Sequence, residues 1–136
     1  MAVMFGSQEW PKAVCQEVNK SQSYKEAAEK WEGDMYIIVE PDTTFKHRII
    51  TYLDLWHGEC RSACVVTDES EKTPAYRMWG PFSIMMQILE KKLDPVQAMM
   101  TGKLNLKGDM AQIMRMPRAA TELVNCMTQF ETEFTE

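Results

Sequence analysis

The sequence lacks a long apolar run, a basic block and a glycine-rich phosphate loop. No segment approaches the roughly 20 apolar residues of a membrane-spanning helix. Acidic residues (20) outnumber basic ones (15), giving a net charge of −5. Nucleic-acid affinity comes largely from neutralising phosphates, so this charge balance argues against a nucleic-acid partner. It also argues against stable docking on an anionic membrane by electrostatics alone.

Targeting signals are also missing from the sequence. Residues 1–10 have neither a basic start nor the apolar core, roughly 7–15 residues long, of a secretory signal. The last three residues are not a peroxisomal tripeptide. We therefore expect a cytoplasmic protein without stable membrane insertion.

Cysteine and histidine are scarce, and their spacing does not favour a metal or catalytic site. Cys60 and Cys64 are predicted to lie on one face of a single strand, about 13 Å apart at ~3.3 Å per residue. A disulfide requires Cα atoms within about 7 Å, so we expect Cys15, Cys60, Cys64 and Cys126 to be reduced. His57 precedes Cys60 by three residues, which raises the alternatives of a zinc site or a thiol nucleophile. The strand spacing separates the two cysteines too far to share an ion, and we predict no metal, no cofactor and no catalytic residue.

Methionine, by contrast, is abundant. Of the 12 methionines, eight lie between Met78 and Met116. Methionine is flexible and polarizable, so it suits surfaces that fit ligands of varied shape, although it also serves as ordinary core filler. Composition alone leaves both interpretations open.

The apolar periodicity changes along the chain from strand-like to helical. Two helices are predicted first, then four strands, then helices interrupted by a fifth strand. This order indicates an α+β fold, with a five-stranded, mostly antiparallel sheet covered by helices, and one domain spanning residues 1–136. The expected helices are 8–19, 23–31, 82–89, a helix from 95, 110–116 and 118–130, and the expected strands are 35–39, 46–56, 59–67, 74–79 and 103–107.

The segment Gly102–Met110 is the most informative stretch of the sequence. Lys103–Lys107 alternates polar and apolar residues, so it predicts a strand with Leu104 and Leu106 on one face. Gly108 ends the strand, and Asp109 is placed to cap a following helix. That helix presents Met110, Ile113 and Met114 on one side, as the wall of an apolar cavity would.

The same segment, reading Gly-Lys-Leu-x-apolar-Lys-Gly-Asp, resembles the late motif of the sterol carrier protein lipid-binding domain. Tyr24–Asp34 is similar to the junction between helix and first strand in small microbial members of that family. Leu93–Gly102 is similar to the segment before the Gly-Lys-Leu strand, and the order of elements agrees along nearly the whole chain. The resemblance implies a nonspecific carrier that holds a fatty acid, acyl-CoA, sterol or isoprenoid-like ligand in an apolar tunnel, without catalysis.

The expected cavity has three sides. The helices after residue 82 form one side, Leu104 and Leu106 the sheet side, and the last helix acts as a lid. Exposed Lys103, Lys107 or Arg115 near a mouth would meet a carboxylate or phosphate head group. The predicted ligand-binding residues are Phe82, Met85, Met86, Leu89, Met99, Met100, Leu104, Leu106, Met110, Ile113, Met114, Leu123 and Met127.

Two other functional classes remain open on the sequence alone. The first is an accessory or dimerising module that binds a protein partner or a second copy of itself through edge strands or the outer faces of Tyr52 and Trp56. It predicts a filled core and a large apolar surface patch. The second is an enzyme with a hydrophobic pocket, which predicts an acid or histidine of strongly shifted pKa inside that pocket.

Overall fold

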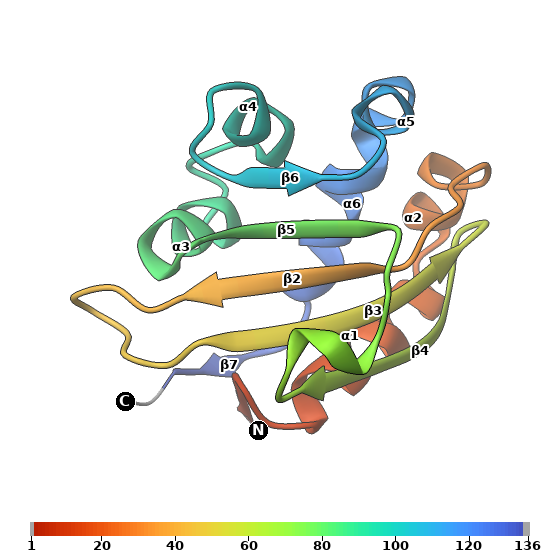
Figure 1. Cartoon of the computed structure of the whole chain (residues 1–136). Helices are drawn as coiled ribbons and strands as arrows, with labels where there is room; N and C mark the ends of the chain where they lie inside the picture. The colour runs from red at the N-terminus through yellow and green to blue at the C-terminus, as the bar shows by residue number, and fades with distance from the viewer. Residues whose placement is uncertain (1, 135–136) are drawn as a thin grey trace.

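The computed structural model describes residues 2–134, and within them it contains six α-helices, a five-stranded sheet and a small two-stranded sheet (Figure 1). The peroxisomal-signal prediction involves residues 135 and 136, which lie outside the described residues. The helices are α1 (Glu9–Lys20), α2 (Gln22–Ala27), α3 (Phe82–Leu89), α4 (Pro95–Met100), α5 (Met110–Arg115) and α6 (Pro117–Met127). The strands are β1 (Val3–Met4), β2 (Met35–Glu40), β3 (Ile49–Trp56), β4 (Glu59–Val66), β5 (Tyr76–Pro81), β6 (Asn105–Lys107) and β7 (Thr132–Glu133).

The large sheet has the strand order β4-β3-β2-β5-β6. Strands β2, β3 and β4 form an antiparallel meander, β5 runs parallel to β2, and β6 runs antiparallel to β5. The predicted α+β class with a five-stranded sheet is therefore confirmed, and the sheet is mixed. The parallel pairing of β1 with β7, which joins the two ends of the chain, was not predicted.

The turn between β3 and β4 lies at His57-Gly58, between the two strands expected over 46–56 and 59–67. Both residues have positive φ, 50° and 82° respectively. Two successive left-handed residues match the twist of a tight hairpin, and glycine accepts this conformation without a steric cost.

A β-bulge in the same hairpin overturns one expectation. Leu53 pairs with Ala63, whereas Leu55 pairs with Cys60, so β4 contains an extra residue at this point. The extra residue reverses the alternation, because side chains change face with every residue. Cys60 therefore packs in the main core, while Cys64 lies on the opposite face, across from Tyr52. The prediction that Cys60 and Cys64 share a face was wrong; all four cysteines are free thiols in the structure.

The helix caps also differ in part from expectation. The second helix was expected to begin at residue 23, but α2 begins at Gln22, and the Ser21 side chain accepts a hydrogen bond from the Tyr24 amide (3.0 Å). A true capping box forms in the polar segment after β4, where Asp68 and Glu71 cap the short 3₁₀ helix η1 (Glu69–Glu71).

This η1 segment covers part of the outer face of the sheet (Figure 1). The Tyr36 hydroxyl donates to the Glu69 carbonyl oxygen (2.9 Å) and accepts from the Lys72 amide (2.9 Å). The outer face buries its own small cluster of Tyr36, Ile38, Ile50, Tyr52 and Val66. The helices α1–α6 all lie on the other side of the sheet (Figure 1).

Helix α6 occupies the centre of the helical layer. It contacts each of the other five α-helices described, whereas the sheet receives its main helical contacts from α1 and α3. α6 is therefore carried by the surrounding helices at a distance from the strands. This arrangement leaves space between α6 and the sheet.

The start of α3 is capped from a distant loop. Its own N-cap position is Pro81, which makes no side-chain capping bond. Asp42 supplies the acceptor instead: Oδ2 accepts from the Ser83 amide (2.8 Å), and Oδ1 accepts from the Thr44 and Phe45 amides (2.8 and 3.1 Å). These amides, that of Thr44 most strongly, lower the pKa of Asp42. Asp42 thus ties the β2–β3 loop to the first turn of α3.

The substitution Asp42→Ala is expected to lower Tm by roughly 2–5 °C at neutral pH, because it leaves three amides without an acceptor. The pKa of Asp42 is depressed in the folded state, so its contribution is present above the unfolded pKa of about 4 and is lost as pH falls through the lower folded value. The difference between wild type and variant should therefore shrink below about pH 4. Thermal unfolding followed by circular dichroism from pH 7 to 3 tests this; an undiminished difference at pH 3 would contradict it.

Candidate functional site: an apolar cavity

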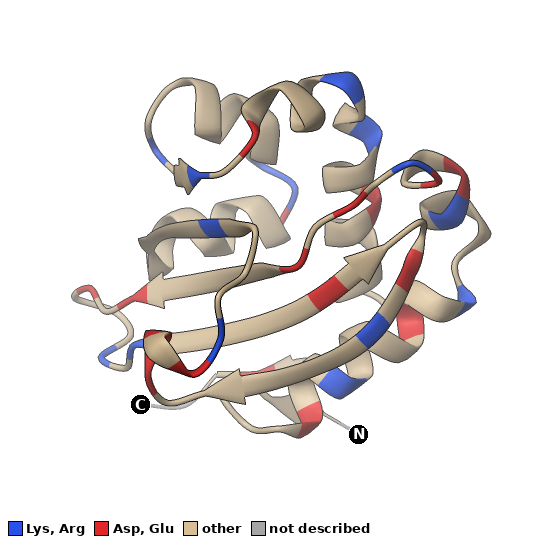
Figure 2. Cartoon of the chain, turned by 45° about the vertical axis from the view of Figure 1, so that its right-hand side comes forward, with Lys and Arg blue, Asp and Glu red and all other residues tan. Residues whose placement is uncertain are grey.

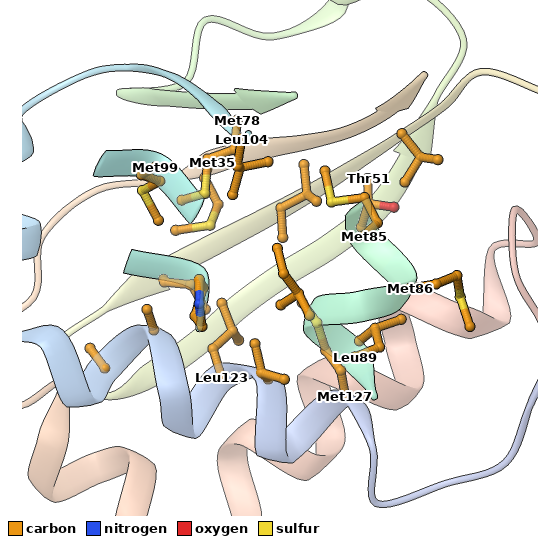
Figure 3. Close-up of a pocket in the computed structure, with 18 of the residues that line it drawn as sticks. Met35, Thr51, Met78, Met85, Met86, Leu89, Met99, Leu104, Leu123 and Met127 are labelled. Atoms are coloured by element: carbon orange, nitrogen blue, oxygen red, sulfur yellow. The ribbon is translucent and has the colours of Figure 1, made fainter. Parts of the chain in front are cut away.

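A cavity lies between the inner face of the sheet and the helices α3–α6 (Figure 3). The sheet contributes its floor, and α6 forms the opposite wall with Leu123 and Met127. Helices α3 and α4 supply further methionines, including Met85, Met86 and Met99. The space between α6 and the sheet is therefore a real cavity that side chains leave unfilled.

Nine of the thirteen predicted ligand-binding residues line this cavity: Phe82, Met85, Met86, Leu89, Met99, Leu104, Ile113, Leu123 and Met127. Their spatial convergence is a geometric result, and their contact with a ligand stays a prediction. Leu104 precedes β6 rather than lying within the strand, which begins at Asn105.

Four predicted residues do not line the cavity. Leu106 and Met110 are half-buried against the main core, while Met100 and Met114 are 57% and 48% exposed. α4 and α5 have only six residues each, so each buries a narrow stripe: Val96 and Ala98 in α4, and Ile113 in α5. Met100 and Met114 follow these stripes by one or two residues and face outward.

Most of the residues that form the sheet floor of the cavity were not predicted from the sequence. Met35, Ile37 and Val39 of β2 line the cavity, as do Thr51 and Leu55 of β3. Their alternation in sequence was a usable signal, because alternate residues of a strand share one face. Aromatic residues at one end, Phe5, Trp10 and Phe134, gave no such signal. Their position depends on the unpredicted pairing of β1 with β7.

The cavity lining is almost entirely apolar. None of the described residues that line it is lysine, arginine, histidine, aspartate or glutamate. The two indole N–H groups on the lining are already satisfied: Trp31 donates to the Gly33 carbonyl oxygen (2.9 Å) and Trp10 to Thr132 Oγ1 (3.0 Å). Placing an ionised group inside would cost several kcal/mol. The cavity therefore suits hydrocarbon.

The geometry does not favour the thiol nucleophile or the zinc site that the sequence left as alternatives. Cys60 does not line the cavity, and burial, followed by its hydrogen bond with the Cys15 thiol, raises its pKa. A raised thiol pKa lowers the thiolate fraction, and the thiolate is the nucleophile. Within residues 2–134, no cluster of three or more His, Cys, Asp or Glu side chains is arranged to hold a metal ion.

The basic residues considered for a head group lie outside the cavity. Lys103, Lys107 and Arg115 are all exposed, and Figure 2 shows basic positions beside β6 and at the end of α5. Met99 of α4, Met116 between α5 and α6, and Ala120 of α6 line the cavity and are only partly buried.

The free space in the cavity is about 100 Å³, less than the roughly 300–1,000 Å³ of typical small-molecule pockets. A larger ligand therefore requires side chains to move. Seven of the residues that line the cavity are methionines, whose three rotatable bonds make such movement inexpensive.

An α+β fold with an apolar cavity between sheet and helices is the geometry of a protein that can enclose an apolar molecule. Comparison of the sequence with protein-family models gives a match to the SCP-2 sterol transfer family over residues 12–120. The chain belongs to this family, and the resemblance stated from the sequence is confirmed. No curated protein matches the sequence.

Solved structures agree with this assignment. A crystal structure of sterol carrier protein 2 is 33% identical, with a TM-score of 0.82, and the match covers 93% of this chain and 98% of that one. A conserved hypothetical protein of Thermus thermophilus, described as a candidate sterol carrier protein, is 32% identical with a TM-score of 0.84, covering 98% and 94%. Sterol carrier protein 2 of Yarrowia lipolytica shares the fold at 16% identity, with a TM-score of 0.58 and coverage of 87% and 88%.

A larger side chain should be tolerated at a position that lines the cavity but not at a position in the packed core. Ala119 lines the cavity, whereas Ala98 is fully buried outside it. We expect Ala119→Leu to lower the free energy of unfolding by less than about 1 kcal/mol, or to raise it, because the added carbons enter empty apolar space. The matched variant Ala98→Leu should lose about 1–3 kcal/mol by overpacking. Urea denaturation measures both, and equal losses in the two variants would contradict an open cavity.

Proposed function

We propose that this protein is a non-catalytic, nonspecific lipid carrier that holds a fatty acid, acyl-CoA, sterol or isoprenoid-like molecule in the cavity between α6 and the sheet. The observation that carries the proposal is the uncharged, apolar lining in a chain of the SCP-2 sterol transfer family. We also propose that residues 1–136 act as one lipid-binding domain. The cytoplasmic location stays a prediction from the sequence.

The energetics of such a site require no specific polar contact. Burying one CH₂ group contributes about 0.8 kcal/mol, so ten or more methylenes supply roughly the 8 kcal/mol of a micromolar complex. Since none of the described residues that line the cavity is cationic, an ionised head group would remain at the mouth of the cavity. Lys103, between α4 and β6, and Arg115, the last residue of α5, are exposed and could meet such a group.

Ligand entry would depend on the methionines. The free volume is small before a ligand enters, so an alkyl chain has to displace side chains such as Met85, Met86 and Met99. Flexible thioether side chains repack against chains of different shape, which favours broad rather than narrow ligand choice.

The alternative of an interaction module gains less support. Edge strand β4 is a natural place for pairing with another chain. The Gln8 side chain already occupies part of this edge: it donates to the Val65 carbonyl oxygen (2.9 Å) and accepts from the Val65 amide (2.9 Å). A partner protein or a homodimer remains a weaker proposal than the carrier.

Two neighbouring methionines provide a matched test of ligand position. Met99 lines the cavity, whereas Met100 is mainly exposed. We expect Met99→Glu to weaken uptake of a fluorescent fatty acid by at least about tenfold, because it places a charge against the buried alkyl chain. Met100→Glu should bind within about twofold of wild type. Fluorescence titration measures both affinities; equal binding by wild type and Met99→Glu would place the ligand elsewhere.

A further inference from the structure

Two hydroxyl groups interrupt the apolar lining of the cavity. Thr51 lies on β3, where it pairs with Ile37 and Val65 and points to the same face as Leu55, and Tyr24 lies on α2. They are 1% and 2% exposed, and both line the cavity. Figure 3 shows Thr51 with its side-chain oxygen on the sheet side of the cavity.

Neither hydroxyl is hydrogen-bonded within residues 2–134. The other three tyrosines show the contrast: the hydroxyls of Tyr36, Tyr52 and Tyr76 bond to Glu69, Asp34 and Asp109. Every fully enclosed side-chain nitrogen or oxygen in the described part of the chain has a partner. The Thr51 hydroxyl is therefore not fully enclosed, and it opens onto the cavity that its side chain lines on the inner face of the sheet.

We propose that the Thr51 hydroxyl is a polar subsite that hydrogen-bonds an uncharged oxygen of the bound lipid. This inference rests on the proposed carrier function and narrows its ligand class. A buried hydroxyl without a partner loses the hydrogen bonds that water would give it, so a ligand oxygen that restores one is favoured over a methylene in the same place.

The oxygen that fits this subsite is uncharged for an electrostatic reason. No cationic side chain among the described residues lines the cavity, so a carboxylate or phosphate buried there would have no counter-charge. Long-chain alcohols and ketones therefore match the interior, whereas ionised groups belong at the mouth.

The test compares two lipids of equal size, 1-hexadecanol and heptadecane, each delivered from cyclodextrin in competition with a fluorescent fatty acid. The measured quantity is the ratio of the two affinities in each variant. We expect Thr51→Val, which removes a hydroxyl with little change of shape, to lower the ratio of hexadecanol to heptadecane affinity about three- to tenfold. The control Thr44→Val, exposed and outside the cavity, should keep the wild-type ratio.

The outcomes separate this inference from the carrier function. Retained heptadecane binding shows that a variant is folded and that the cavity accepts hydrocarbon. A ratio within about twofold of wild type in Thr51→Val would overturn the polar subsite and leave the carrier function intact. Wild-type protein that takes up neither lipid would contradict the carrier function itself, and the subsite with it.

Discussion

The support of α6 by its neighbouring helices is the constraint on which the rest of the structure depends. α6 contacts α1 to α5, while α1 and α3 make the main helical contacts with the sheet. The central helix is thereby held above an apolar sheet face that it does not fully cover. A protein interior is normally close-packed, and unfilled apolar space costs stability. Such space can receive an apolar molecule, which is consistent with the proposed carrier function.

This constraint explains how an otherwise ordinary core becomes a binding site. The main core continues around the cavity through the buried residues Trp10, Val14 and Leu53, which pack the surrounding helices against the sheet. Flexible methionines of α3, α4 and α6 line one side of the cavity, whereas three residues of its floor, Ile37, Val39 and Thr51, are β-branched and stiff. Adaptable methionines of this kind would support the proposed broad ligand range without any specific polar contact. The proposed Thr51 subsite would add a modest preference within that range.

The helix Phe82–Leu89 and the strand beginning at Met35 were predictable because their apolar spacing is local and uninterrupted. The Asp109 cap was also predictable from one residue type at a helix start, and its side chain accepts from the Gln112 amide. The bulge in β4 was not predictable, since nothing in the alternation of Cys60 to Cys64 marks an extra residue. Met100 and Met114 show a related limit: apolar periodicity identifies a helix face but not how little of a six-residue helix is buried.

The helical wall of the cavity was easier to predict than its aromatic end. Leu123 and Met127 follow from the helical spacing of α6, whereas Phe134 reaches the cavity through the distant pairing of β1 with β7. The Asp42 cap on α3 has the same character, because it joins residues 41 positions apart. Contacts of this kind depend on tertiary structure, and no local sequence pattern predicts them.

The most direct test of the carrier function is native mass spectrometry of the freshly purified protein, followed by organic extraction and identification of any released lipid. The account predicts a mass above that of the bare chain and a fatty acid, acyl-CoA, isoprenoid or other lipid in the extract. A bare-chain mass, together with no uptake of added fatty acid, would contradict it and would favour a module that binds another protein.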